Sequence, residues 1–147
     1  MSRVLLGALT LAGMIPHAAA SQEQYLCQAN EAAGVRYDPS TGSWEGMGLR
    51  TTSKFIITVP KEDDLHPYTD SAFVVLLLGD QFPSYQCSEG FTDLGFLACD
   101  GPYGAFAMNN RSLRFQAFYS LGYVKTPEVP DGEGNTPGIQ IGVCSPF

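Results

Sequence analysis

The chain has 147 residues and a formal net charge of −7, from 8 basic and 15 acidic side chains. This charge argues against nucleic acid as a partner, because such binding needs a basic surface. The chain is 44% apolar and only 16% charged, with one Trp, seven Tyr and nine Phe. This composition predicts one packed globular domain rather than a disordered acidic chain.

The first twenty residues have the pattern of a secretory signal peptide. Arg3 precedes an apolar run from Val4 to Ile15, and the small residues Ala18-Ala19-Ala20 follow. A helix of that run is about 18 Å long, which is short of the roughly 30 Å apolar core of a bilayer. We therefore expect cleavage after Ala20, a periplasmic or secreted location, no membrane span after cleavage, and a single mature domain over residues 21–147.

The four cysteines all lie beyond this leader, and their even number predicts two disulfides. Three pairings are possible. We favour Cys87–Cys99, which closes a local loop, together with Cys27–Cys144, which joins the two ends of the mature chain. The cysteines lack the close pairs that a zinc site needs, so no metal is expected there.

The first element of the mature chain is ambiguous. Residues 22–33 have a composition that suits a helix, whereas Tyr25-Leu26-Cys27 suits the start of a strand. A hairpin is expected next. Turn-forming residues at 38–42 separate the run 34–37 from Trp44.

Several short strands follow. Alternating apolar and polar residues predict a strand over 54–59, which Pro60 ends. The run 73–78 is apolar on both faces, so we expect a strand that is central or covered. Two more short strands are expected, at 84–87 and 95–99.

The clearest hairpin joins the runs 104–108 and 112–121, with a tight turn at Asn109-Asn110, residues that tolerate positive φ. In its second strand, Phe118 is the single apolar residue on an otherwise polar face. A last strand is expected at 139–144. Seven or eight short strands predict a mainly β fold with few helices, either a single antiparallel barrel or a sandwich.

The acidic loops carry the few residues that could do chemistry. His66 is the one histidine left after cleavage, and a small periplasmic hydrolase would use it with Asp63 or Asp64. Acidic residues between 62 and 70, and the run 131–135, allow a calcium-stabilised structural protein instead. Neither alternative has a complete motif, so we predict no catalytic residue, no cofactor and no defined metal site.

The chain contains, in order, Tyr25-Leu26-Cys27, Gly34-Val35-Arg36-Tyr37-Asp38, Trp44, Cys87, Leu97-Ala98-Cys99, residues 108–115, Gly122-Tyr123 and residues 136–144. This series resembles short exported proteins of Gram-negative bacteria, mostly of undescribed role. The resemblance implies a periplasmic or secreted location and brings no catalytic residues. Residues 33–37 also resemble, in part, a loop of the periplasmic C-type lysozyme inhibitors, with Ala33 in place of Ser and without their downstream Lys-Gly segment.

We expect a non-catalytic binding or protein-interaction module. Its partner would be another envelope or secreted protein, or a small apolar or sugar ligand. Loops at the ends of β scaffolds carry recognition. The expected binding surface therefore combines the two long loops, 60–72 and 125–138, with Trp44, Arg36, Phe118 and Arg114.

Overall fold

The computed structural model describes residues 24–60, 70–124 and 136–147, and these residues form nine strands and no helix. The predicted signal peptide lies outside the described residues. The strands are β1 (Tyr25–Asp38), β2 (Ser43–Leu49), β3 (Lys54–Thr58), β4 (Phe73–Leu77), β5 (Tyr85–Cys87), β6 (Phe96–Gly101), β7 (Gly104–Asn109), β8 (Arg114–Tyr119) and β9 (Gly138–Pro146).

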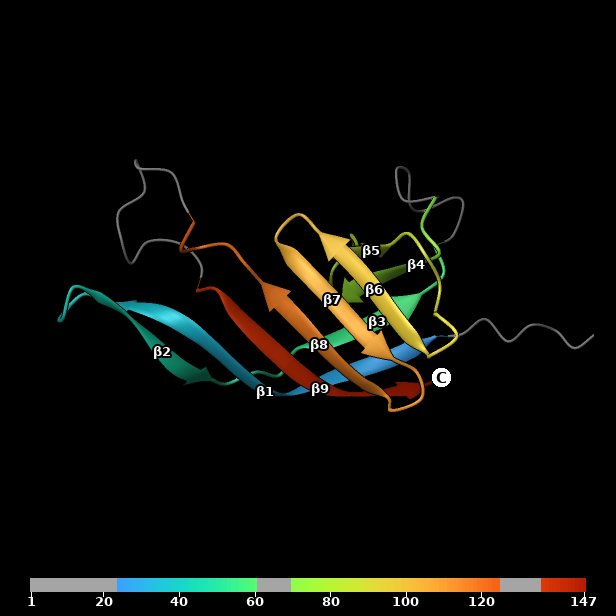
Figure 1. Ribbon diagram of the computed structural model, residues 1–147, viewed down its shortest axis with the longest axis horizontal. Coiled ribbons are helices and arrows are strands. Elements are labelled where there is room, and N and C mark those ends of the chain that lie inside the picture. Colours follow the sequence, from blue (N-terminus) through green and yellow to red (C-terminus); the bar gives the residue numbers. More distant parts are fainter. Residues whose placement is uncertain (1–23, 61–69, 125–135) are drawn as a thin grey trace, which may run out of the picture.

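Eight of these strands form a closed antiparallel barrel (Figure 1). The strand order is β1-β3-β4-β5-β6-β7-β8-β9, and β9 pairs again with β1 to close the ring. The predicted mainly β fold is therefore confirmed, and the barrel is the correct one of the two expected architectures. The ambiguous segment at 22–33 belongs to strand β1, because pairing with β9 over most of its length overrides its helix-favouring composition.

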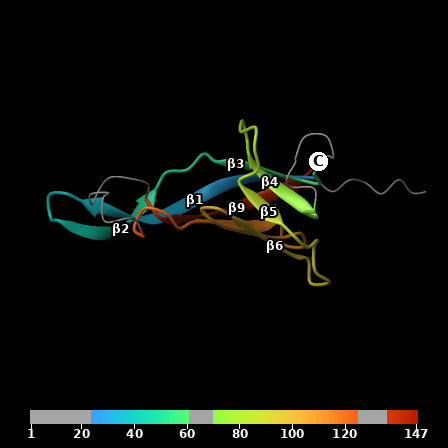
Figure 2. The same cartoon turned by 90° about the horizontal axis from the view of Figure 1, so that it is seen from above.

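The ninth strand, β2, lies outside the ring. It pairs with the second half of β1, from Ala32 opposite Leu49 to Asp38 opposite Ser43, while the first half of β1 pairs with β3. Figures 1 and 2 show this β1–β2 ribbon extending away from the barrel. The predicted turn closes it: the Ser40 N–H and hydroxyl donate to Asp38 Oδ1 at 2.8 and 2.7 Å, and these bonds lower the pKa of Asp38.

A β-bulge at Asn30 separates the two halves of β1. The register between β1 and β9 passes from Ala29 directly to Glu31, which leaves Asn30 without an opposite residue. An extra residue reverses which side chains face inward. Ala29 is buried before the bulge, whereas after it Ala32 faces the barrel mouth and Ala33 lies exposed on the outer wall.

The barrel interior is filled by aromatic and branched side chains. The rings of Phe55, Phe106 and Phe115 pack together, with centroids 5.3–5.6 Å apart. The predicted inward faces of β3 and β8 are thus confirmed. On β4, Val74 and Val75 are both fully buried, and the strand lies between β3 and β5, as its two apolar faces predicted.

Both favoured disulfides are present. Cys27–Cys144 joins β1 to β9 across the barrel seam, and Cys87–Cys99 joins β5 to β6. All four cysteines are buried. Two structural disulfides indicate an oxidising compartment outside the cytosol.

The β7–β8 hairpin forms as predicted, but the expected tight turn at Asn109-Asn110 is wrong. Asn109 remains paired with Arg114, and the loop spans residues 110–113. The Asn109 side chain instead accepts hydrogen bonds from the N–H groups of Arg111 (2.9 Å) and Ser112 (3.1 Å). The positive φ falls on Leu113 (55°), whose side chain packs against the core.

Candidate functional site

A pocket of about 520 Å³ opens at the end of the barrel where β1 leaves β3 and continues into the ribbon. This size is within the range of small-molecule sites, and barrel mouths are frequent positions for them. The loop 50–53, between β2 and β3, forms one wall. The lining residues are Ala32, Leu49, Arg50, Thr51, Thr52, Ser53, Tyr85, Ala117, Phe118, Tyr119, Thr136, Gly138, Ile139 and Gln140. We call it the mouth pocket.

A hydrogen-bonded set of side chains fixes the loop against β9. The Thr51 hydroxyl donates to Gln140 Oε1 at 2.8 Å and accepts from the Ser53 N–H at 3.2 Å. Within the described residues, the Gln140 side-chain NH₂ group has no partner, although the side chain is half-buried. This half-buried amide donor is therefore available to a ligand acceptor.

Among the described residues that line the pocket, Arg50 is the one formally charged side chain, and none is acidic. The side chain is exposed, and it has no ion-pair or hydrogen-bond partner among the described residues. The whole chain carries a net charge of −7, whereas the described lining carries one positive charge and no negative one. Such a site favours an anion.

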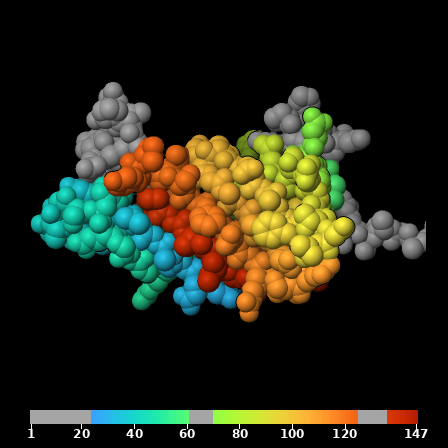
Figure 3. Space-filling model, viewed as in Figure 1, coloured from blue at the N-terminus to red at the C-terminus, as the bar shows by residue number. Residues whose placement is uncertain are grey.

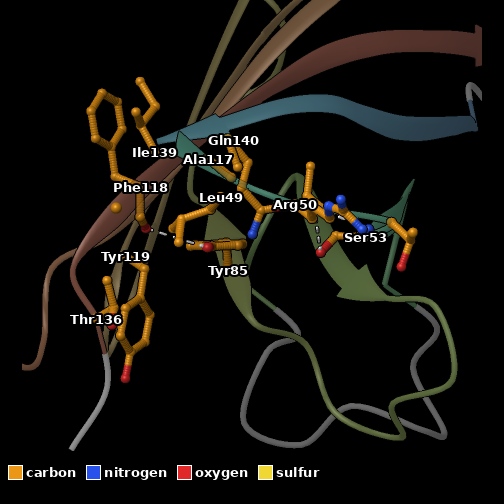
Figure 4. Close-up of a pocket in the computed structure, with 14 residues that line it drawn as sticks. Leu49, Arg50, Ser53, Tyr85, Ala117, Phe118, Tyr119, Thr136, Ile139 and Gln140 are labelled. Atoms are coloured by element: carbon orange, nitrogen blue, oxygen red, sulfur yellow. Dashed lines mark hydrogen bonds between the residues drawn. The ribbon is translucent and has the colours of Figure 1, made fainter. Parts of the chain in front are cut away.

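Tyr85 and Leu49 supply the less polar part of the mouth pocket. Figure 4 shows both side chains between the β8–β9 strands and the Arg50–Ser53 loop, with Phe118 and Ile139 pointing away from them. Burial raises the pKa of Tyr85, so its phenol remains a neutral donor. The hydroxyl lies 3.4 Å from the Phe118 carbonyl oxygen, to which it donates.

A second, apolar groove of about 460 Å³ lies on the outer wall beside the mouth pocket. Phe118 on β8, Ile139 on β9 and Ala33 on β1 form a row there, because each is directly opposite the next. Val35 extends the groove along β1. Phe118 and Val35 are 41% and 40% exposed. In Figure 3 the red atoms of β9 lie on this surface between the blue atoms of β1 and the orange atoms of β8.

The four residues predicted to bind are placed in separate parts of this surface. Phe118 lies in the apolar groove, whereas Arg114 lies at the opposite end of the same strand. Trp44 is on β2, where its ring packs between those of Tyr37 (5.8 Å) and Tyr123 (5.2 Å). Arg36 pairs with Glu45 in the ribbon, and paired residues project to the same face. Since Trp44 is next to Glu45 in the strand, Arg36 and Trp44 project from different faces of the ribbon.

The acidic-loop alternatives fall largely outside the described residues. Asp63, Asp64, His66 and the run 131–135 are not described, and Asp70 is exposed. Over residues 24–60, 70–124 and 136–147, no group of three or more potential metal ligands comes together. In those same stretches, no helix is of a length and hydropathy to cross a membrane.

Sequence reasoning did not select Arg50, Thr51, Tyr85 or Gln140. One signal was present for Gln140, which shares a strand face with the buried Cys144 and is polar where an apolar residue would be expected. Comparison with known protein families, curated proteins and solved structures gives no match. The chemistry of the mouth pocket is therefore inferred from its own residues.

Proposed function

We propose that the protein is a non-catalytic binding module whose ligand is a small organic acid held in the mouth pocket. The observation that carries this proposal is the cavity of about 520 Å³ in which Arg50 and Gln140 present donors, with no acidic side chain among the described lining residues. An exported location, periplasmic or secreted after cleavage at Ala20, is supported by the disulfides and by the leader pattern.

The ligand chemistry follows from the donors. A guanidinium group matches the two oxygens of a carboxylate, and the Gln140 amide adds a further donor. Leu49, Ala117 and the Tyr85 ring offer contact to an apolar or aromatic body. The expected ligand class, which included apolar compounds and sugars, thus narrows to an acid with a compact apolar part.

The non-catalytic part of the proposal is supported by the side chains in the lining. Most acid–base and nucleophilic catalysis uses histidine, carboxylates or free cysteine. None of these is among the described residues that line the mouth pocket, and the cysteines of the described chain are all in disulfides. The lining residues instead provide neutral donors, hydroxyls and one cation, which suits retention of a ligand rather than its conversion.

The test is a titration of the oxidised protein with benzoate, followed through amide chemical shifts in NMR spectra. Benzyl alcohol serves as the neutral ligand of similar shape, and glucose tests the sugar alternative. We expect benzoate alone to shift the amide signals of Gln140, Thr51 and Ala117. Arg50→Gln should weaken benzoate binding at least about tenfold, equivalent to about 1.4 kcal/mol.

Arg114→Gln is the matched control, because it removes an exposed guanidinium at the far end of β8. It should leave benzoate binding unchanged. Equal binding of benzoate and benzyl alcohol, or equal losses in the two Arg variants, would contradict the assignment of an acid to this pocket.

A further inference from the structure

The outer edge of β2 is an exposed strand edge with its own set of backbone hydrogen-bonding groups. β2 ends the strand order, so among the described residues it has a neighbour on one side only. Natural proteins usually protect such edges with Pro, Lys or a bulge. β2 has no Pro or Lys, and its register with β1 is continuous over all seven residues.

The hydrogen bonds of β1 identify the groups that point outward from this edge. The Val35 N–H donates to the Pro137 carbonyl at 3.0 Å, so the backbone groups of Val35 face β9. Gly46 is directly opposite Val35. In an antiparallel pair of strands, two residues that lie opposite each other direct their backbone N–H and C=O groups either both toward the other strand or both away from it. The N–H and C=O groups of Gly46 therefore face away from β1, and those of Trp44 and Gly48 do the same by alternation.

The side chains of these three residues share one face, which is the outer wall. Gly48 is opposite Ala33, Ala33 is opposite Ile139, and Ile139 is opposite Phe118. The apolar row of the outer wall thus ends at Gly48, where no side chain continues it. A Cβ atom placed on Gly46 or on Gly48 would have no atom within 4 Å, so the space above both glycines is open.

We propose that a second copy of this chain adds to this edge, pairing β2 with β2 about a two-fold axis at Gly46. In this register Gly46 faces the partner's Gly46, and Trp44 faces the partner's Gly48 on either side. Each of these facing pairs exchanges two backbone hydrogen bonds. The outward-pointing N–H and C=O groups of all three residues in each strand then have hydrogen-bond partners.

The same register sets each Trp44 directly opposite the partner's Gly48. Residues directly opposite each other project to the same face, so the partner's Trp44 stands beside Gly48 at the end of the row formed by Ala33, Ile139 and Phe118. The indole itself packs between the rings of Tyr37 and Tyr123 of its own chain. The edge is therefore complementary to itself through its backbone groups and through the open space above the two glycines.

Neighbouring registers are less favourable. An axis at Glu45 would set two carboxylates directly opposite each other, which is destabilising. An axis at Met47 would make Glu45 face Leu49 and leave Trp44 beyond the paired glycines. The dimer centred on Gly46 uses every outward-pointing residue and keeps the two Glu45 side chains apart.

The proposal is tested by sedimentation of the full oxidised chain over a concentration series up to about 1 mM. We expect a dimer that dissociates on dilution. Gly46→Pro should abolish it, because proline removes an outward N–H while leaving the bonds between β1 and β2 intact. Gly46→Ala is the matched control: it keeps the N–H and has room for its methyl group, so the dimer should persist.

Amide hydrogen exchange measured on the wild-type chain tests the register without relying on any variant. The amides of Trp44, Gly46 and Gly48 should exchange more slowly as concentration rises, while those of Glu45 and Met47 stay protected at every concentration through β1. A monomer throughout the series, or exchange at 44, 46 and 48 that does not change with concentration, overturns the proposal. A dimer that survives in folded Gly46→Pro, with circular dichroism confirming the fold, also overturns it.

Discussion

Removal of the seam disulfide should destabilise the barrel more than removal of the short one. The Cys27–Cys144 bond closes a sequence separation of 117 residues, and the Cys87–Cys99 bond one of 12. In the chain-entropy description, a cross-link limits the unfolded chain more when its loop is longer. The two bonds are then worth about 5 and about 3 kcal/mol, a difference of about 2 kcal/mol.

The comparison is well controlled because the four cysteines have similar surroundings. Their exposed fractions lie between 0 and 3%. Each double substitution to alanine therefore loses two equally buried sulfur atoms, and the packing losses largely cancel. The remaining difference in the free energy of unfolding between the two variants comes from loop length. Since small domains are stable by about 5–15 kcal/mol, the loss of the seam bond removes a large part of the total.

The assay is equilibrium unfolding in urea without reductant, on Cys27→Ala/Cys144→Ala and on Cys87→Ala/Cys99→Ala. We expect the midpoint to fall in both variants and to fall further in the first. Equal midpoints, or a lower midpoint for the short-loop variant, would show that loop entropy does not decide the order. A change in the slope with denaturant would point to altered unfolded chains rather than to the folded barrel.

Two further predictions concern single residues. Gly142→Ala should lower the free energy of unfolding by about 1–3 kcal/mol, because its Cβ would overlap the Gln28 carbonyl oxygen and lie 2.9 Å from Ala29 Cα. Urea unfolding measures this loss, with Gly48→Ala as the control because the space at Gly48 is open. Equal midpoints for the two variants would refute the prediction. Tyr85 should ionise above the usual value of 10.0, because burial raises its pKa. Its contribution to stability is complete below pH 10 and is lost as the pH rises through the raised pKa. Absorbance titration of the wild type and Tyr85→Phe would show the high-pH step in the wild type alone, and its presence in both would contradict the assignment.

Local patterns predicted the parts of the fold that depend on neighbouring residues. Alternation alone identified the buried face of β3, with Phe55 and Ile57, and that of β8, with Phe115 and Ala117. The spacing of the cysteines favoured the correct disulfides. Residues 22–33 stayed ambiguous because their strand state depends on pairing with β9, more than 100 positions away. No local feature marks the bulge at Asn30.

The candidate site was harder to predict for the same reason. The bond between Thr51 and Gln140 joins residues 89 positions apart, and only the closed barrel brings them together. Arg50 follows a strand whose position outside the ring was not predicted. The sequence did indicate Phe118, because one apolar residue on a polar face is visible in the alternation. It could not indicate that Arg114 lies far from the groove.

The bulge at Asn30 gives length changes in β1 an unusual meaning. In most surface loops, one residue more or less changes only the reach of the loop. Deletion of Asn30 would leave Ala29 opposite Gly142 and Glu31 opposite Ile141, so the alternation along β1 would become regular and the ribbon would keep its faces. Val35 would remain in the apolar groove. In a strand without a bulge, such as β8, the loss of one residue would instead turn over every side chain that follows, because alternation along a strand has a period of two. β1 can therefore lose this one residue without exchanging its inner and outer walls.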